Sequence, residues 1–94
     1  MEQEIIDQVK LVLNTWNPLG KNAKKIKDLN NYETEVIDIL FFIETEITST
    51  RPVEVKKKIQ KILYEIISET FFINLNAEEC SQAAEKIYQI VYKK

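Results

Sequence analysis

Histidine is absent from the 94 residues, and cysteine, glycine, tryptophan and arginine each occur once. Without histidine the chain cannot form a Ser-His-Asp or Cys-His pair for nucleophilic catalysis, and it lacks the most common zinc ligand. The single cysteine, Cys80, cannot form an internal disulfide, which suits a reducing compartment. One glycine and two prolines leave few positions for tight turns, so a sandwich or barrel of many short strands is disfavoured. These absences favour a few long helices.

Signals for export or membrane insertion are also missing. The first 16 residues, MEQEIIDQVKLVLNTW, carry acids where a signal peptide has bases, and no apolar stretch is long enough to span a membrane. We therefore expect a cytoplasmic protein with one domain over residues 1–94. Heavy use of isoleucine, lysine and asparagine is what AT-rich codons produce, and it predicts a bacterial source.

Apolar residues recur at helical spacing in four segments, at positions 5–16, 32–47, 55–67 and 80–91. Pro52 suits the first turn of a helix, and Asn30 with Glu33 and Asn76 with Glu79 have the spacing of capping boxes. The pattern predicts an all-α fold, a compact bundle of four main helices. The polar connection at 21–31 has room for one short extra helical turn.

The stretch WNPLG, residues 16–20, gathers the only tryptophan, the only glycine and one of the two prolines. Trp16 is the last apolar residue of the first stripe, and Pro18 disfavours helix in the residue before it. Asn17, Pro18, Leu19 and Gly20 match the preferences of a type I turn. We expect Trp16 to close one end of the core while the next four residues turn the chain.

Four short motifs follow one another along the chain: WNPLG, YETEVIDIL, KKIQKI and NAEEC. In order and type they resemble a small bacterial helical family catalogued as domain of unknown function eighteen seventy-one. The chain departs from that family in a longer lysine-rich connection after Gly20, and in Asn17, where aspartate is commoner. The resemblance implies an all-helical domain without an established activity.

The second apolar segment carries more apolar residues than one helix face can hold. A helix that is apolar nearly all round is either central in its domain or covered by another chain. Both alternatives stay open from the sequence. In the second, the helix meets a second copy or a protein partner, and the candidate interface consists of Ile37, Phe41, Phe42, Phe71 and Phe72.

Lysines gather in two runs, although the net charge is only -2. A basic run can face an acidic segment within the domain, or it can contact nucleic acid through phosphates. Base recognition has little support, because the aromatic residues are not interleaved with the lysines. The candidate basic face consists of Lys21, Lys24, Lys25, Lys27, Lys56, Lys57, Lys58 and Lys61.

Three other residues carry reactive or ligating groups. Cys80 lies on an apolar stripe, so we expect a buried, inert thiol. Glu35 and Asp38 share one helix flank, but two carboxylates are too few for a hard cation, and we expect both to be solvated. No further carboxylate set or glycine-rich phosphate loop accompanies them. We therefore expect neither an enzyme nor a cofactor.

Together these observations predict a cytoplasmic, non-enzymatic protein–protein interaction module. An immunity-type inhibitor of a toxin is a more specific version, since such proteins are often small and acidic. A weak RNA-binding protein that uses its lysine clusters is the alternative from another class.

Overall fold

The computed structural model describes residues 2–26 and 29–92, and these residues form helices and connections without a strand. The predicted all-α fold with four main helices is confirmed. A 3-10 helix in the first connection supplies the short extra turn. The elements are α1 (Gln3–Trp16), η1 (Gly20–Lys25), η2 (Asn30–Tyr32), α2 (Glu33–Glu46), α3 (Pro52–Phe71) and α4 (Ala77–Tyr92).

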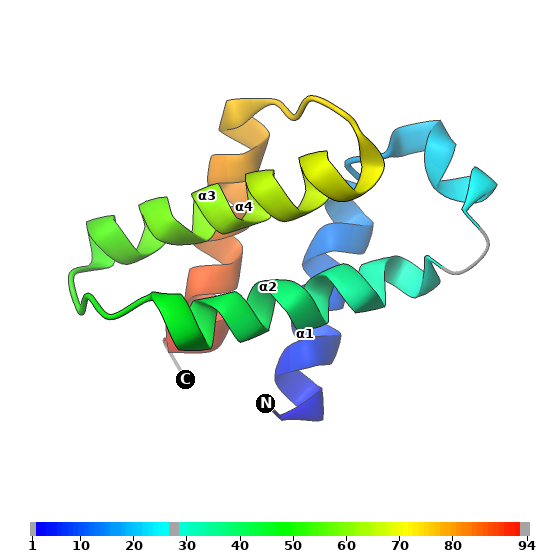
Figure 1. The fold of residues 1–94 in the computed structure, drawn as a ribbon. Helices are drawn as coiled ribbons and strands as arrows, with labels where there is room; N and C mark the ends of the chain where they lie inside the picture. The colour runs from blue at the N-terminus through cyan, green and yellow to red at the C-terminus, as the bar shows by residue number, and fades with distance from the viewer. Residues whose placement is uncertain (1, 27–28, 93–94) are drawn as a thin grey trace.

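The four α-helices form two antiparallel pairs that cross (Figure 1). In this view α2 and α3 lie side by side in front, while α1 and α4 run steeply across them behind. Each helix packs on two others, so that α1 contacts α2, α2 contacts α3, α3 contacts α4 and α4 contacts α1. Every helix therefore has one face turned into the common core and another turned outward.

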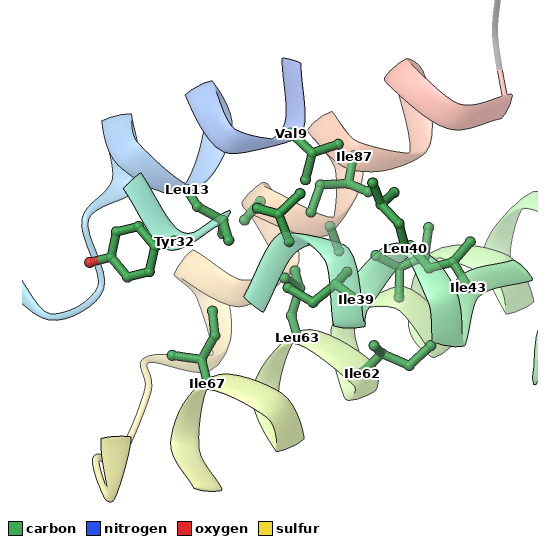
Figure 2. Packing of buried hydrophobic residues seen from close by; sticks show 14 of the residues in the cluster. Val9, Leu13, Tyr32, Ile39, Leu40, Ile43, Ile62, Leu63, Ile67 and Ile87 are labelled. Atoms are coloured by element: carbon green, nitrogen blue, oxygen red, sulfur yellow. The ribbon is translucent and has the colours of Figure 1, made fainter. Parts of the chain in front are cut away.

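The core is built from the predicted apolar stripes, and Figure 2 shows side chains of all four helices meeting there. Isoleucine, leucine and valine dominate it, and Tyr32 is its largest buried side chain. Burial of such side chains is the main favourable term in folding, at about 25 cal/mol per Å² of apolar area. The residues labelled in Figure 2 are Val9, Leu13, Tyr32, Ile39, Leu40, Ile43, Ile62, Leu63, Ile67 and Ile87.

The WNPLG turn has the predicted form. Helix α1 ends at Trp16, and the amide of Gly20 donates to the carbonyl of Asn17 at 2.8 Å, as in a β-turn. Trp16 packs on the rim of the core and donates from Nε1 to Glu79 Oε1 of α4 at 2.7 Å. The rare residues are thus explained by turning the chain and joining α1 to α4.

Tyr32 also holds this turn, a contact that the sequence did not predict. Its hydroxyl donates to Asn17 Oδ1 at 2.7 Å and accepts from the Leu19 amide at 3.3 Å. Burial raises the pKa of this hydroxyl, so it stays protonated and keeps its role as a donor. The bonds connect the end of α1 to the start of α2 and fix the position of α2 in the fold.

The two predicted capping boxes have different outcomes. Asn76 precedes α4 and accepts from the Glu79 amide at 3.0 Å, which confirms it as a helix cap. The prediction for Asn30 is wrong, because this residue is the first of η2, and its side chain donates to the Glu33 carboxylate instead of capping a backbone amide. The amides at the start of α2 have no side-chain cap.

Candidate protein interface

Helix α2 has two apolar faces, of which only one is buried. Its inner face consists of Val36, Ile39, Leu40 and Ile43, which are at most 2 % exposed. Its outer face carries Ile37, Phe41 and Phe42, which are 50, 57 and 36 % exposed. Neighbouring helices therefore do not cover the extra apolar side chains of α2, which removes the alternative that they are internal to the domain.

The outer side chains lie close enough to form one surface. Ile37 and Phe41 are one helical turn apart on α2, and side chains at this spacing are neighbours on a helix surface. The Phe41 and Phe42 rings are in edge contact, with centroids 5.7 Å apart and planes at 72°. We refer to Ile37, Phe41 and Phe42 as the outer face of α2.

A groove between α2 and α3 continues this surface. It has a volume of about 180 Å³, which is below the roughly 300–1,000 Å³ of typical small-molecule sites. Phe42 lies on its α2 side, and Ile62 and Ile66 lie on its α3 side. A groove of this size suits an inserted side chain better than a free ligand. Its complete lining is Phe42, Glu46, Lys58, Lys61, Ile62, Glu65, Ile66 and Glu69.

Charge is distributed unevenly along the α3 side of this groove. Lys58 and Lys61 come first in the helix, and Glu65 and Glu69 follow at a spacing of three to four residues. Lys61 Nζ is 3.9 Å from Glu65 Oε1, and both side chains are well exposed. An exposed pair of this kind contributes only about 0.3–0.5 kcal/mol to folding. These four charges are therefore free to contribute to an interface.

The two remaining interface candidates do not share this surface. Phe71 is the last residue of α3 and is partly buried, with its ring packed edge-on against Tyr32 at a centroid distance of 6.2 Å. Phe72 follows the helix end with a φ of 55° and is 92 % exposed. Helix α3 thus ends at Phe71, and residues 72–76 connect it to α4.

The predicted basic face is split into separate clusters. Residues 21–25 lie in or beside η1, whereas residues 56–61 lie in the first half of α3, and these segments occupy opposite ends of the molecule in Figure 1. Lys27 lies outside the described residues. Lys56 pairs with Glu85 at 2.9 Å, and its Nζ is 5.0 Å from the Tyr88 ring centroid, so its charge is engaged within the domain.

Glu35 does not have the solvated position that was expected. Its residue is 7 % exposed, and its Oε1 has no hydrogen-bond partner. Burial raises the pKa of the Glu35 carboxyl, and the charge of nearby Asp38 adds to the shift. Glu35 lies one helical turn before Ile39 and on the same side of α2. Its carboxylate is therefore placed at the edge of the core. Asp38 is exposed, as predicted.

The remaining reactive group lies inside the fold. Cys80 is fully buried, and burial raises the pKa of its thiol, which disfavours the nucleophilic thiolate. Within residues 2–26 and 29–92, no three side chains of the His, Cys, Asp and Glu types gather as a metal site. None of the helices in this part of the chain has the length and apolar character that a membrane crossing requires.

Comparison of the chain with protein-family models, curated protein sequences and solved structures finds no match. The resemblance to the helical family named above therefore stays a prediction.

Proposed function

We propose that this protein is a non-enzymatic, cytoplasmic interaction module that binds another protein chain through the outer face of α2. The observation that most directly supports this proposal is the exposure of Ile37, Phe41 and Phe42 on the outer face of α2. Aromatic side chains are enriched at the centres of protein interfaces, where they bury large apolar area with few rotatable bonds. Contact with another chain would remove this apolar surface from water.

Single exposed apolar residues elsewhere provide a useful contrast. Leu11 of α1 and Val53 of α3 are each 65 % exposed. Isolated residues of this kind are common on protein surfaces and carry no functional implication. The outer face of α2 differs because two rings and an isoleucine lie on adjacent turns and continue into a groove that Ile62 and Ile66 also line.

Two charge properties bear on the choice of partner class. Residues 33–46 contain five acids and neither lysine nor arginine, which disfavours nucleic acid as the occupant of this face. The lysines give RNA binding less support than a continuous basic patch would, because their two clusters lie at opposite ends of the molecule. A protein chain is thus the better-supported partner.

Photocrosslinking in the native cells tests this proposal. A benzophenone-bearing phenylalanine analogue in place of Phe41 is expected to yield one discrete protein adduct on irradiation, because the buried interface holds the reactive ring against a fixed neighbour. The matched control carries the same analogue in place of Leu11, which is similarly exposed, at 65 % against 57 % for Phe41.

A crosslinked adduct with twice the mass of this chain supports the proposed function, and so does an adduct with a different protein. If position 41 yields no more adduct than position 11, the outer face of α2 is not an interface and the proposal is wrong.

A further inference from the structure

We infer that the occupant of this surface is a second copy of the same chain, packed about a two-fold axis with the two α3 helices antiparallel. This inference rests on the proposed function and deepens it by naming the partner. In such an interface both copies use the same surface, so residue i of one copy meets residue j of the other and the reverse contact also forms. The surface must then be complementary to itself in charge and in shape.

The charges along α3 meet this requirement in one register. Lys61 and Glu65 lie two residues on either side of Leu63, while Lys58 and Glu69 lie five and six residues from it. All four line the same groove. If two α3 helices pack antiparallel about an axis at the level of Leu63, Lys61 faces Glu65 and Lys58 faces Glu69 of the other copy. Both kinds of pair form twice, so one axis pairs these eight α3 charges, while Glu46 of α2, which also lines the groove, is not part of these pairs.

The apolar side chains of the groove lie beside these charged pairs. Ile62 and Ile66 flank the level of Leu63 on α3, and Phe42 reaches the same groove from α2. Phe41, in ring contact with Phe42, projects beside the groove and is more exposed. Each copy therefore offers a protruding ring and an adjacent hollow of about 180 Å³.

Charge also disfavours the other ways of joining two copies. A parallel arrangement would place lysine against lysine and glutamate against glutamate. Contact centred on two α2 helices would bring together Asp38, Glu44 and Glu46 of both copies, with no base on either helix to offset them. Like charges facing each other oppose association by several kcal/mol. Of these three arrangements, the antiparallel α3 register is the one that pairs opposite charges.

Light scattering on size-exclusion chromatography over a dilution series tests the inference with the full chain. The wild-type protein is expected to show twice the monomer mass of 11.1 kDa at high concentration and to dissociate on dilution. Phe41→Gln removes the protruding ring and is expected to weaken the dimer at least about tenfold. The matched control is Leu11→Gln, a similarly exposed site on α1, and it is expected to leave the dissociation constant unchanged.

Charge swaps test the register. The double variant Lys58→Glu/Lys61→Glu and the double variant Glu65→Lys/Glu69→Lys should each be monomeric, because each places like charges across the axis. An equimolar mixture of the two should recover a dimer, since every facing pair is then again of opposite sign. That recovery also shows that both variants are folded. The control for charge reversal outside the proposed interface is the double variant Lys24→Glu/Lys25→Glu in η1. It is expected to dimerise as the wild type does.

A wild-type protein that stays monomeric at every concentration overturns the inference. So does a dimer that survives both double variants, or a mixture that stays monomeric. If the wild-type protein is monomeric but Phe41 crosslinks to a different protein, this inference fails and the proposed function stands. If Phe41 crosslinks to nothing, both fail.

Discussion

The inner and outer faces of α2 are both apolar but have opposite surroundings. Ile39 is fully buried between neighbouring helices, whereas Ile37, two residues away, is half exposed. Helix periodicity alone places these residues about 200° apart around the axis. The comparison teaches that apolar content identifies what a helix can bury, while the packing of its neighbours decides which of those residues the chain itself covers.

The largest expected effect on stability comes from a change in the inner face of α2. Ile39→Ala removes fully buried methyl groups and leaves a cavity, so the free energy of unfolding should fall by roughly 2–5 kcal/mol. The matched change on the outer face, Ile37→Ala, should alter it by less than about 0.5 kcal/mol, as is usual for surface positions. Urea unfolding of both variants, at protein concentrations below the dissociation constant of the dimer, measures the two losses. Equal losses would show that Ile37 is buried in the monomer.

An intermediate effect is expected at Tyr32, which lies on the buried side of the start of α2. Tyr32→Phe removes the hydroxyl that bonds Asn17 and the Leu19 amide. The free energy of unfolding should fall by about 1–3 kcal/mol, because the amide of the buried Leu19 loses its partner. Asn17→Asp keeps an acceptor for the hydroxyl and should retain most of the stability. A loss below about 0.5 kcal/mol for Tyr32→Phe would mean that water replaces both bonds.

The smallest expected effect concerns Glu35, the polar member of the inner face. A carboxyl whose pKa is raised on folding stabilises the fold fully below its unfolded pKa, close to the ordinary value of 4.5, and this contribution is lost as pH rises through the folded pKa. Glu35→Gln does not titrate, so its stability relative to the wild type should increase between pH 4 and pH 7.

The expected gain for Glu35→Gln at pH 7 is on the order of 1 kcal/mol, since a buried charged oxygen without a partner is disfavoured. Urea unfolding of both proteins at pH 4 and pH 7 measures it. A difference between the two proteins that is the same at both pH values would show that Glu35 stays hydrated in the native state.

Local signals predicted much of the fold. Pro18 and Pro52 mark the end of α1 and the start of α3 correctly, because proline acts through its own ring and lost amide. Asn76 caps α4 as its spacing suggests. Asn30 has the same spacing but does not cap α2, since the backbone there follows η2 first. Identical local patterns thus diverge where the preceding connection is held by distant contacts such as Tyr32 with Asn17.

The candidate site was only partly predictable. Phe41 and Phe42 stood out as apolar residues beyond the main stripe, and both are exposed. Phe71 had the same apolar character but packs on Tyr32 instead. Glu65 and Glu69 were not predicted as interface residues, although the four charges follow one another at a spacing of three to four residues, which indicates that both acids share one face of the helix with Lys58 and Lys61. Their importance depends on the groove that they share with Phe42, and that groove requires α2 to lie beside α3.

Composition and periodicity by themselves determined that this chain forms four helices and which stripe of each enters the core, because helix pitch and apolar burial act locally along the chain. Only the tertiary structure decided that α1 with α4 crosses α2 with α3, that Glu35 is buried, and that the outer face of α2 is left uncovered. These outcomes depend on which helices become neighbours. That choice is made by contacts between residues far apart in the sequence.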